Sequence, residues 1–324
     1  MRPENIPREW MEIALFAGAA FLFSQISLLF FLMAVPLILL GKRQGLRALL
    51  IAGGFLLVVL LVQIYFRVGT IEEPVLRRFF FMMKFAYPLT MIAGVWILFW
   101  ARGRTLFRIL TASGFVLLIS LPIAGYYTGN QEVMEFLKEQ LQILLGNIQA
   151  GLNSNAAGET EILLSSLESE ELYELVSKIF TRNYLVSYFL VISFSWYVAE
   201  GFYHGIHGGQ NFLISSFRLG ESFLWPFLIT WAGVLLDVTV GVPYLGFLFW
   251  NYGVILLLIY ALQGIGIMKF LFGRYGVSRL IQTLTLFSAV LVMMTPRLNL
   301  VLIIGVPLLG ISEYWVRYRT PVQQ

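Results

Sequence analysis

The chain has 324 residues, of which 59% are hydrophobic and 12% are charged, and its formal net charge is +4. Soluble domains carry about 25% charged residues, so a chain of this length with half that density cannot coat a soluble globule. The absence of cysteine excludes disulfides, thiolate catalysis, iron–sulfur clusters and cysteine-ligated zinc.

Long apolar runs recur along the chain and predict an all-α protein, a polytopic integral membrane bundle with about 8–10 membrane segments. The runs are 11–40, 45–66, 79–100, 105–125, 184–203, 222–240, 244–270, 279–295 and 298–316. They are apolar on every face, which argues against the alternating strands of a membrane barrel.

The first run is too long for one ordinary span and holds Ser24, Gln25 and Ser27 in its middle. We expect a helix near 11–24 and a short or re-entrant helix near 27–40, with a single tilted helix as the alternative. No small-residue cleavage site follows the first apolar stretch, which indicates a retained helix and not a removed signal peptide.

Basic residues in the connections predict how these runs are oriented across the membrane. The links 41–47, 101–108 and 273–279 and the tail 315–319 carry Lys or Arg without an acid. Because cytoplasmic loops collect Lys and Arg, we expect these four segments inside and residues 126–183 outside, in the cytoplasmic (inner) membrane of a cell. The N-terminus lies inside if the first run is a hairpin, and outside if it is one helix.

Residues 126–183 form an acidic insert between the membrane regions 1–125 and 184–324. It holds nine glutamates against three basic residues, a net charge of −6. Apolar residues at helical spacing predict two extracytoplasmic amphipathic helices joined by a Gly- and Asn-rich linker. They either lie on the membrane or, as an acidic sequence favours, pack on the bundle or on a partner protein. The net positive charge of the chain therefore comes from the basic connections between the membrane segments and not from a nucleic-acid-binding surface, which argues against a nucleic-acid partner.

A few polar residues fall within the apolar runs, where they are functional candidates. Asp237 and Asn251 lie on either side of the tight GVPY turn, so they could face one cavity with Trp250 and bind a small ligand. The alternative for Asp237 is an interfacial carboxylate that reaches water. Gln263 is flanked by small residues such as Gly264, which predicts helix packing through an interhelical amide bond.

Two further pairs share a helix face at i, i+4 spacing. Glu200 and His204 form either a surface pair or a coupling or proton site. Glu313 and Arg317 are expected to form a capping ion pair. No metal-ligand cluster, nucleotide-binding loop or nucleophile–base pair is recognisable, so we expect neither an enzyme nor a metal or cofactor.

The C-terminal half resembles the YybS-like bacterial membrane proteins, a family of unknown function. The match covers roughly 215–319 and rests on short motifs: Phe217, Arg218, Leu219, Asn251, Leu262, Gln263, Gly264, Leu309, Gly310, Glu313 and Arg319. Gly220 and Glu313 depart from the family pattern, in which Pro and Asp are usual.

The N-terminal stretch ALFAGAAFLF is similar to the opening of the substrate-binding (S) components of energy-coupling-factor transporters. This resemblance implies a small-molecule-binding transporter subunit that docks onto a membrane partner through small residues of its first helix, here Ala14 and Gly18. The rod-shape protein MreD has a related architecture and transports nothing. A non-transporting scaffold of an envelope or cell-shape assembly is therefore the alternative.

Overall fold

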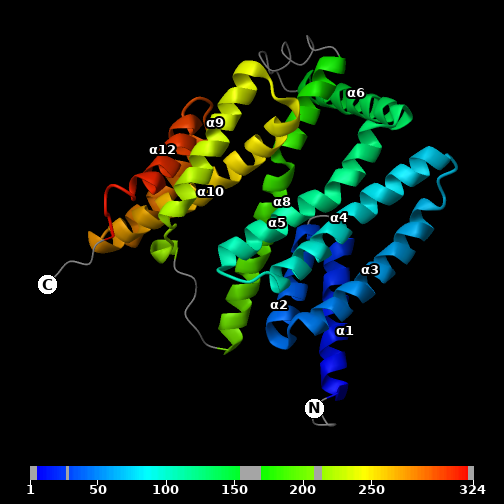
Figure 1. Ribbon diagram of the computed structural model, residues 1–324, viewed down its shortest axis with the longest axis horizontal. Helices are drawn as coiled ribbons and strands as arrows, with labels where there is room; N and C mark the ends of the chain where they lie inside the picture. Colours follow the sequence, from blue (N-terminus) through cyan, green and yellow to red (C-terminus); the bar gives the residue numbers. More distant parts are fainter. Residues whose placement is uncertain (1–5, 27–28, 154–168, 208–213, 320–324) are drawn as a thin grey trace. The chain divides into compact units, whose positions relative to one another are not determined.

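The computed structural model describes residues 6–26, 29–153, 169–207 and 214–319, and these fold into helices without a strand (Figure 1). The helices form two compact units, one before residue 210 and one from residue 210 on. The expected divisions at residues 125 and 183 differ from this, because the insert helices pack within the first unit.

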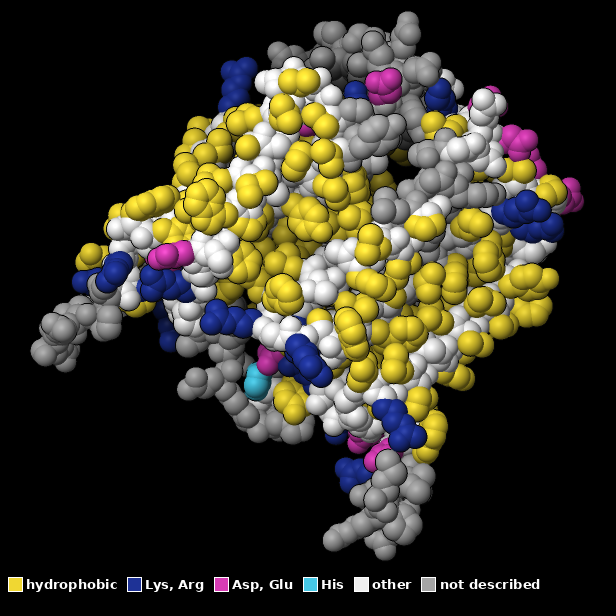
Figure 2. All heavy atoms as spheres, in the orientation of Figure 1, with side chains coloured by type: hydrophobic (Ala, Val, Ile, Leu, Met, Phe, Trp, Pro, Cys, Tyr) yellow, Lys and Arg dark blue, Asp and Glu magenta, His cyan; other side chains and the backbone are white. Residues whose placement is uncertain are grey.

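Five helical segments in the described part of the chain are long and apolar enough to cross a membrane: Leu46–Val68, Pro74–Trp100, Glu174–Gly205, Glu221–Val240 and Leu245–Arg274. Thr105–Ser120, Arg279–Met294 and Asn299–Ser312 are shorter apolar helices. Hydrophobic side chains cover much of the visible surface in Figure 2, as expected where lipid replaces water. The chain is thus an all-α, multi-pass integral membrane protein.

The first unit contains α1 (Ile6–Gln25), a 3₁₀ turn (Phe30–Met33), α2 (Ala34–Gln44), α3 (Leu46–Val68), α4 (Pro74–Trp100), α5 (Thr105–Thr128), α6 (Gln131–Asn153) and α8 (Ser169–His207). The first apolar run is therefore two helices, and the single tilted helix is wrong. Pro36 is in the first turn of α2, where the missing N–H would have no helical partner.

Helix α2 is short and buried. Its 11 residues extend about 17 Å, against a hydrocarbon core of about 30 Å. It packs against α1, α3 and α8, and most of its side chains from Val35 to Leu40 are buried. The turn before it is also enclosed: Phe30 stacks on Tyr87 of α4 at 4.6 Å between ring centroids, and Ser195 of α8 donates to the Phe31 carbonyl at 3.4 Å. Non-helical backbone at membrane depth is stable only with such protein partners.

Helix α8 differs from the expectation. The second amphipathic helix and the following membrane helix form one continuous helix of 39 residues, because no Gly or Pro occurs between Ser169 and Gly201. The predicted linker, residues 149–160, begins within α6, which ends at Asn153, and its remainder lies outside the described residues. Helix α6 packs on α4, α5 and α8 at the end of the unit where α5 ends (Figure 1). Its Phe136 ring meets Phe79 and Phe80 of α4 edge-on.

The second unit contains 3₁₀ turns Ile214–Ser216 and Glu221–Phe223, then α9 (Leu224–Val240), α10 (Pro243–Arg274), α11 (Arg279–Met294) and α12 (Asn299–Ser312). Helix α10 packs on both α9 and α12, while α11 contacts α12. Gly241 has φ +74°, the left-handed conformation that lets α9 turn sharply into α10.

Candidate functional site

Asp237 and Trp250, both predicted ligand residues, are brought together at the α9–α10 turn. The carboxylate of Asp237 accepts from the Val242 backbone N–H at 3.1 Å and from Trp250 Nε1 at 2.9 Å. A side chain on Gly246 would overlap the Asp237 carboxylate, so this glycine makes room for it. Asp237 therefore holds the turn closed, and its ligand role stays a prediction.

Asn251, the third predicted ligand residue, is fully buried in α10. Its Nδ2 donates to the Phe247 carbonyl one turn earlier in the same helix, at 2.8 Å. This bond satisfies one donor of the amide within its own helix. A shared cavity with Asp237 likewise stays a prediction.

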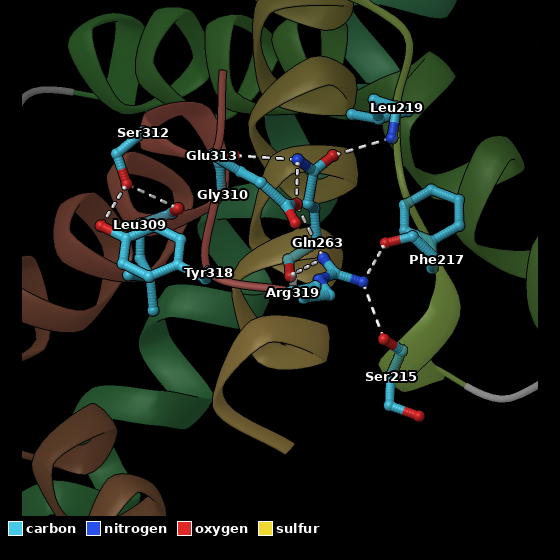
Figure 3. Close-up of polar contacts among 10 residues, drawn as sticks. All are labelled: Ser215, Phe217, Leu219, Gln263, Leu309, Gly310, Ser312, Glu313, Tyr318 and Arg319. Carbon is cyan, nitrogen blue, oxygen red and sulfur yellow. Dashed lines mark hydrogen bonds and ion pairs between the residues drawn. The ribbon is translucent and has the colours of Figure 1, made fainter. Parts of the chain in front are cut away.

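Gln263 lies at the centre of a buried polar network in the second unit (Figure 3). Its Oε1 accepts from the Leu219 backbone N–H at 3.0 Å. Its Nε2 donates to the Gly310 carbonyl at 3.0 Å and to Glu313 Oε2 at 2.9 Å. The side-chain amide thus joins α10 to the end of α12 and to the segment that precedes α9.

Arg319 completes this network. Its guanidinium donates to the Ser215 and Phe217 carbonyls at 2.8 Å each and to Glu313 Oε2 at 2.9 Å. The Glu313 and Arg319 side chains are only 2% and 9% exposed. The predicted Glu313–Arg317 pair is therefore wrong. Helix α12 ends at Ser312, so helical i, i+4 spacing no longer applies beyond Glu313.

Glycines bring the helices of this network into backbone contact. A Cβ on Gly264 would overlap the Val306 carbonyl, and one on Gly310 would overlap the Tyr260 carbonyl. Small residues at such crossings allow close packing in membranes. Many of the positions that carry the YybS-like resemblance meet here, and in this structure they hold backbone segments together.

A tyrosine contact flanks the network. The Tyr314 hydroxyl donates to the Gly220 carbonyl at 3.0 Å and lies 3.0 Å from the Tyr260 hydroxyl. Burial raises the pKa of Tyr314, so the phenol is neutral and available as a donor at physiological pH. The aromatic pair was not anticipated from the sequence, where 54 residues separate the two tyrosines.

The first unit contains a cluster of a different kind. Glu200 accepts from Lys42 Nζ through Oε2, and its Oε1 is 2.7 Å from His204 Nε2. The side chains of Lys42, Glu200 and His204 are 13%, 23% and 24% exposed, so the cluster is largely enclosed but not fully buried. We refer to these three residues as the triad.

Aromatic rings and a second cation surround the triad. Lys42 Nζ lies 4.4 Å from the Trp196 ring centroid, and Arg108 Cζ lies 5.1 Å from it. Arg108 Nε also donates to the Leu98 carbonyl at 2.7 Å, near the end of α4. Cations over an indole ring gain electrostatic attraction, most strongly where water is displaced.

The end of α2 is fixed on its other side by α1. Gln44 Nε2 donates to Glu12 Oε2 at 2.7 Å, and Arg43 Nη2 is 3.6 Å from Glu12 Oε1. Polar contacts thus attach the end of α2 to two helices, α1 through Glu12 and α8 through Glu200. The i, i+4 spacing of Glu200 and His204 anticipated one side of the triad, whereas nothing in the sequence relates Lys42 to residue 200.

The proposed docking residues lie on α1. Ala14 and Gly18 are exposed, and a Cβ on Gly18 would meet nothing within 4 Å. Ala17 and Ala20 are buried on the other face of the helix, against the rest of the first unit. Docking onto a partner stays a prediction.

Comparison of the chain with protein-family models, with curated proteins and with solved structures found no match. The resemblances noted above therefore stay predictions. Over the residues that the structure describes, no group of three or more His, Asp or Glu side chains is placed to hold a metal ion. Of the polar clusters described above, the triad and the Glu12–Arg43 contact each join partly exposed ionisable side chains on two helices of the first unit, and the triad differs in containing a histidine.

Proposed function

We propose that the protein is a subunit of a small-solute transport system of the cytoplasmic membrane, with the triad as its coupling site. The observation that carries this proposal is the short, buried helix α2, which follows a break after α1 and whose end brings Lys42 onto Glu200 and His204. Glu200 and His204 belong to the apolar segment Glu174–Gly205. Ionisable groups in such segments mark solute or proton pathways, and broken helices recur at transporter sites.

A ligand panel tests this proposal. The purified full-length chain in detergent is screened at fixed pH for thermal stabilisation by vitamins, amino acids, carboxylates and phosphorylated metabolites. We expect one chemical class to raise the melting temperature, because a ligand that binds only the folded state stabilises it. The Glu200→Gln variant should lose this stabilisation. If no compound stabilises the unmodified protein, the proposal fails.

A parallel variant separates the two candidate sites. Asp237→Asn keeps one oxygen acceptor for Val242 and Trp250 while removing the charge. If Asp237→Asn abolishes stabilisation and Glu200→Gln does not, the ligand site lies at the α9–α10 turn and the triad has no part in it. Loss with Glu200→Gln alone supports the triad.

A non-transporting scaffold is the second candidate, and one observation favours it. Helix α6 exposes Ile143 and Leu144 on a segment that also carries exposed glutamates, as a partner-binding surface would. Photo-crosslinking from Ile143 in intact cells tests it. A single specific protein adduct would favour the scaffold, and exclusive lipid adducts would exclude this surface.

A further inference from the structure

The triad contains one carboxylate between two nitrogen groups. With His204 neutral, Lys42 and Glu200 balance each other and the three side chains carry no net charge. Histidine is the side chain whose ordinary titration falls between about pH 5 and 8. Proton binding by the imidazole would place two cations on a single partly buried carboxylate.

Within the described residues, the contacts around the triad provide no second anion for that charge. The charged and titratable side chains that face the triad or the adjoining end of α2 are Glu12 from α1, Lys42 and Arg43 from α2, Arg108 from α5, and Glu200, Tyr203 and His204 from α8. Glu12 is bonded to Arg43 and Gln44, and α4 contributes the uncharged Phe99 ring. A proton on His204 therefore adds to an existing surplus of positive charge.

We propose that Glu200 and His204 form a proton-binding site whose occupancy controls the attachment of α2 to α8. A proton from solvent adds to the imidazole nitrogen that carries none, and the resulting imidazolium remains bonded to Glu200. Lys42 then shares the carboxylate with a second cation and is repelled by it and by Arg108. The end of α2 consequently separates from α8 at low pH and returns at high pH.

The geometry of α2 suits such a movement. Gly45 joins α2 to α3 with φ +83°, a conformation that glycine adopts without strain. Gly41 lies against the Phe99 ring, where a Cβ would approach to 2.7 Å. Polar contact between α2 and α8 at this end runs through Lys42, which pairs with Glu200 and lies over the Trp196 and Tyr203 rings of α8. This inference goes beyond solute transport, because it requires only the proton.

Distance measurements on the full-length chain test the movement. The chain has no native cysteine, so Leu39→Cys on α2 and Phe202→Cys on α8 can carry spin labels at known positions. Double electron–electron resonance in lipid nanodiscs should show a longer α2–α8 distance at about pH 5 than at about pH 8. Labels at Val58 and Phe107, both exposed on α3 and α5, serve as the control pair whose distance stays constant.

Two variants should have opposite effects on the α2–α8 distance. Glu200→Gln removes the anion that holds Lys42, so the long distance should persist at every pH. His204→Gln retains a hydrogen-bonding partner for Glu200 without a titrating group, so the short distance should persist. A pH response that survives in His204→Gln would overturn the proposal, as would an α2–α8 distance independent of pH in the unmodified background.

Proton binding is measured separately. The chain has two histidines, so nitrogen NMR of a His207→Gln variant reports on His204 alone. We expect its imidazole signal to titrate over the range in which the distance changes, and Glu200→Gln to shift the midpoint. Titration without movement would overturn control of α2. Solute binding is tested at one fixed pH, so failure of this proposal is distinguishable from failure of the transport proposal.

Discussion

Gln263, Glu313 and Arg319 illustrate how polar side chains are stabilised inside so apolar a chain. Gln263 and Arg319 satisfy backbone groups, namely the Leu219 N–H and the carbonyls of Gly310, Ser215 and Phe217, while Glu313 accepts from both of these side chains. An unsatisfied buried polar group costs about 1–3 kcal/mol, so the network is stable only when complete. Its role in the fold is to attach the chain end to the start of the second unit.

The ion pair at the centre of this network should be strongly coupled. We predict that Glu313→Gln lowers the free energy of unfolding by about 3–5 kcal/mol, because Arg319 then has no buried counter-charge. The double variant Glu313→Gln, Arg319→Gln should lose less than the sum of the single variants. Unfolding in detergent–lipid micelles measures both quantities as a double-mutant cycle.

The exposed pair Glu174–Lys178 is the matched control. It also joins a carboxylate to a cation, at 3.4 Å, but both side chains are more than half exposed. Removing either partner should change stability by less than about 1 kcal/mol. Equal effects for the two pairs would show that the Glu313–Arg319 pair is not buried in the folded protein.

Gly264 supports a second prediction at the scale of a residue. A Cβ there would overlap the Val306 carbonyl, which belongs to backbone and cannot rotate away, so Gly264→Ala should separate α10 from α12. We expect a cost of about 1–3 kcal/mol, seen as a lower melting temperature. Gly305→Ala in α12 is the control, because its Cβ meets nothing within 4 Å. A higher melting temperature for Gly264→Ala would contradict the close approach.

The sequence predicted the role of some of these residues and not of others. Small neighbours around Gln263 anticipated an interhelical amide bond, because small residues and amides act together at membrane crossings. The partner of Glu313 was misassigned to Arg317, since periodicity holds only inside a helix and α12 ends one residue earlier. Lys42 was missed for a related reason: residues 158 positions apart share no local pattern.

At the scale of elements, apolar runs located most helices to within a few residues, because lipid imposes a minimum apolar length. The break between α1 and α2 was also predicted, from Ser24, Gln25 and Ser27 in one long run. The continuity of α8 was not predicted. A change from amphipathic to fully apolar sequence marks a change of environment, and a helix can cross that change without interruption.

The length of helix α8 allows a test of whether one helix continues from water into the membrane. Its 39 residues extend about 58 Å, nearly twice the hydrocarbon thickness, so its first turns must project beyond the membrane. We predict that Lys178→Cys reacts with a water-soluble maleimide in intact membranes, whereas Phe194→Cys does not. Both positions are exposed in the structure, so the difference reports lipid around Phe194.

Denatured protein provides the control for thiol reactivity, since both variants should then label fully. Rapid labelling of Phe194→Cys in membranes would mean that water reaches the middle of α8. In that case the segment Glu174–Gly205 would not span the bilayer as one apolar helix.

For the whole molecule, composition alone identified the class of protein, because 12% charged residues cannot solvate a chain of this length. The division at residue 209 was not predicted. Both units have the same apolar character, and nothing in a hydropathy pattern distinguishes helices that pack together from helices that face lipid. The charge pattern predicts the orientation of the helices across the membrane, because connections rich in Lys and Arg collect on the cytoplasmic side.

That direction gives the last prediction. Glu139 lies on α6 in the acidic insert, while Arg102 and Arg274 lie in or beside the connections after α4 and α10. All three side chains are exposed, so cysteine at each position should be accessible to an impermeant reagent from one side only. We expect Glu139→Cys to label from outside intact cells, and Arg102→Cys and Arg274→Cys only after the membrane is opened. Labelling of Glu139→Cys and Arg102→Cys from the same side would contradict the path of α5, which must carry the chain across between them. Opposite sides for Arg102→Cys and Arg274→Cys would instead contradict the path through α8, α9 and α10, because the basic connections after α4 and α10 would then no longer share the cytoplasmic face.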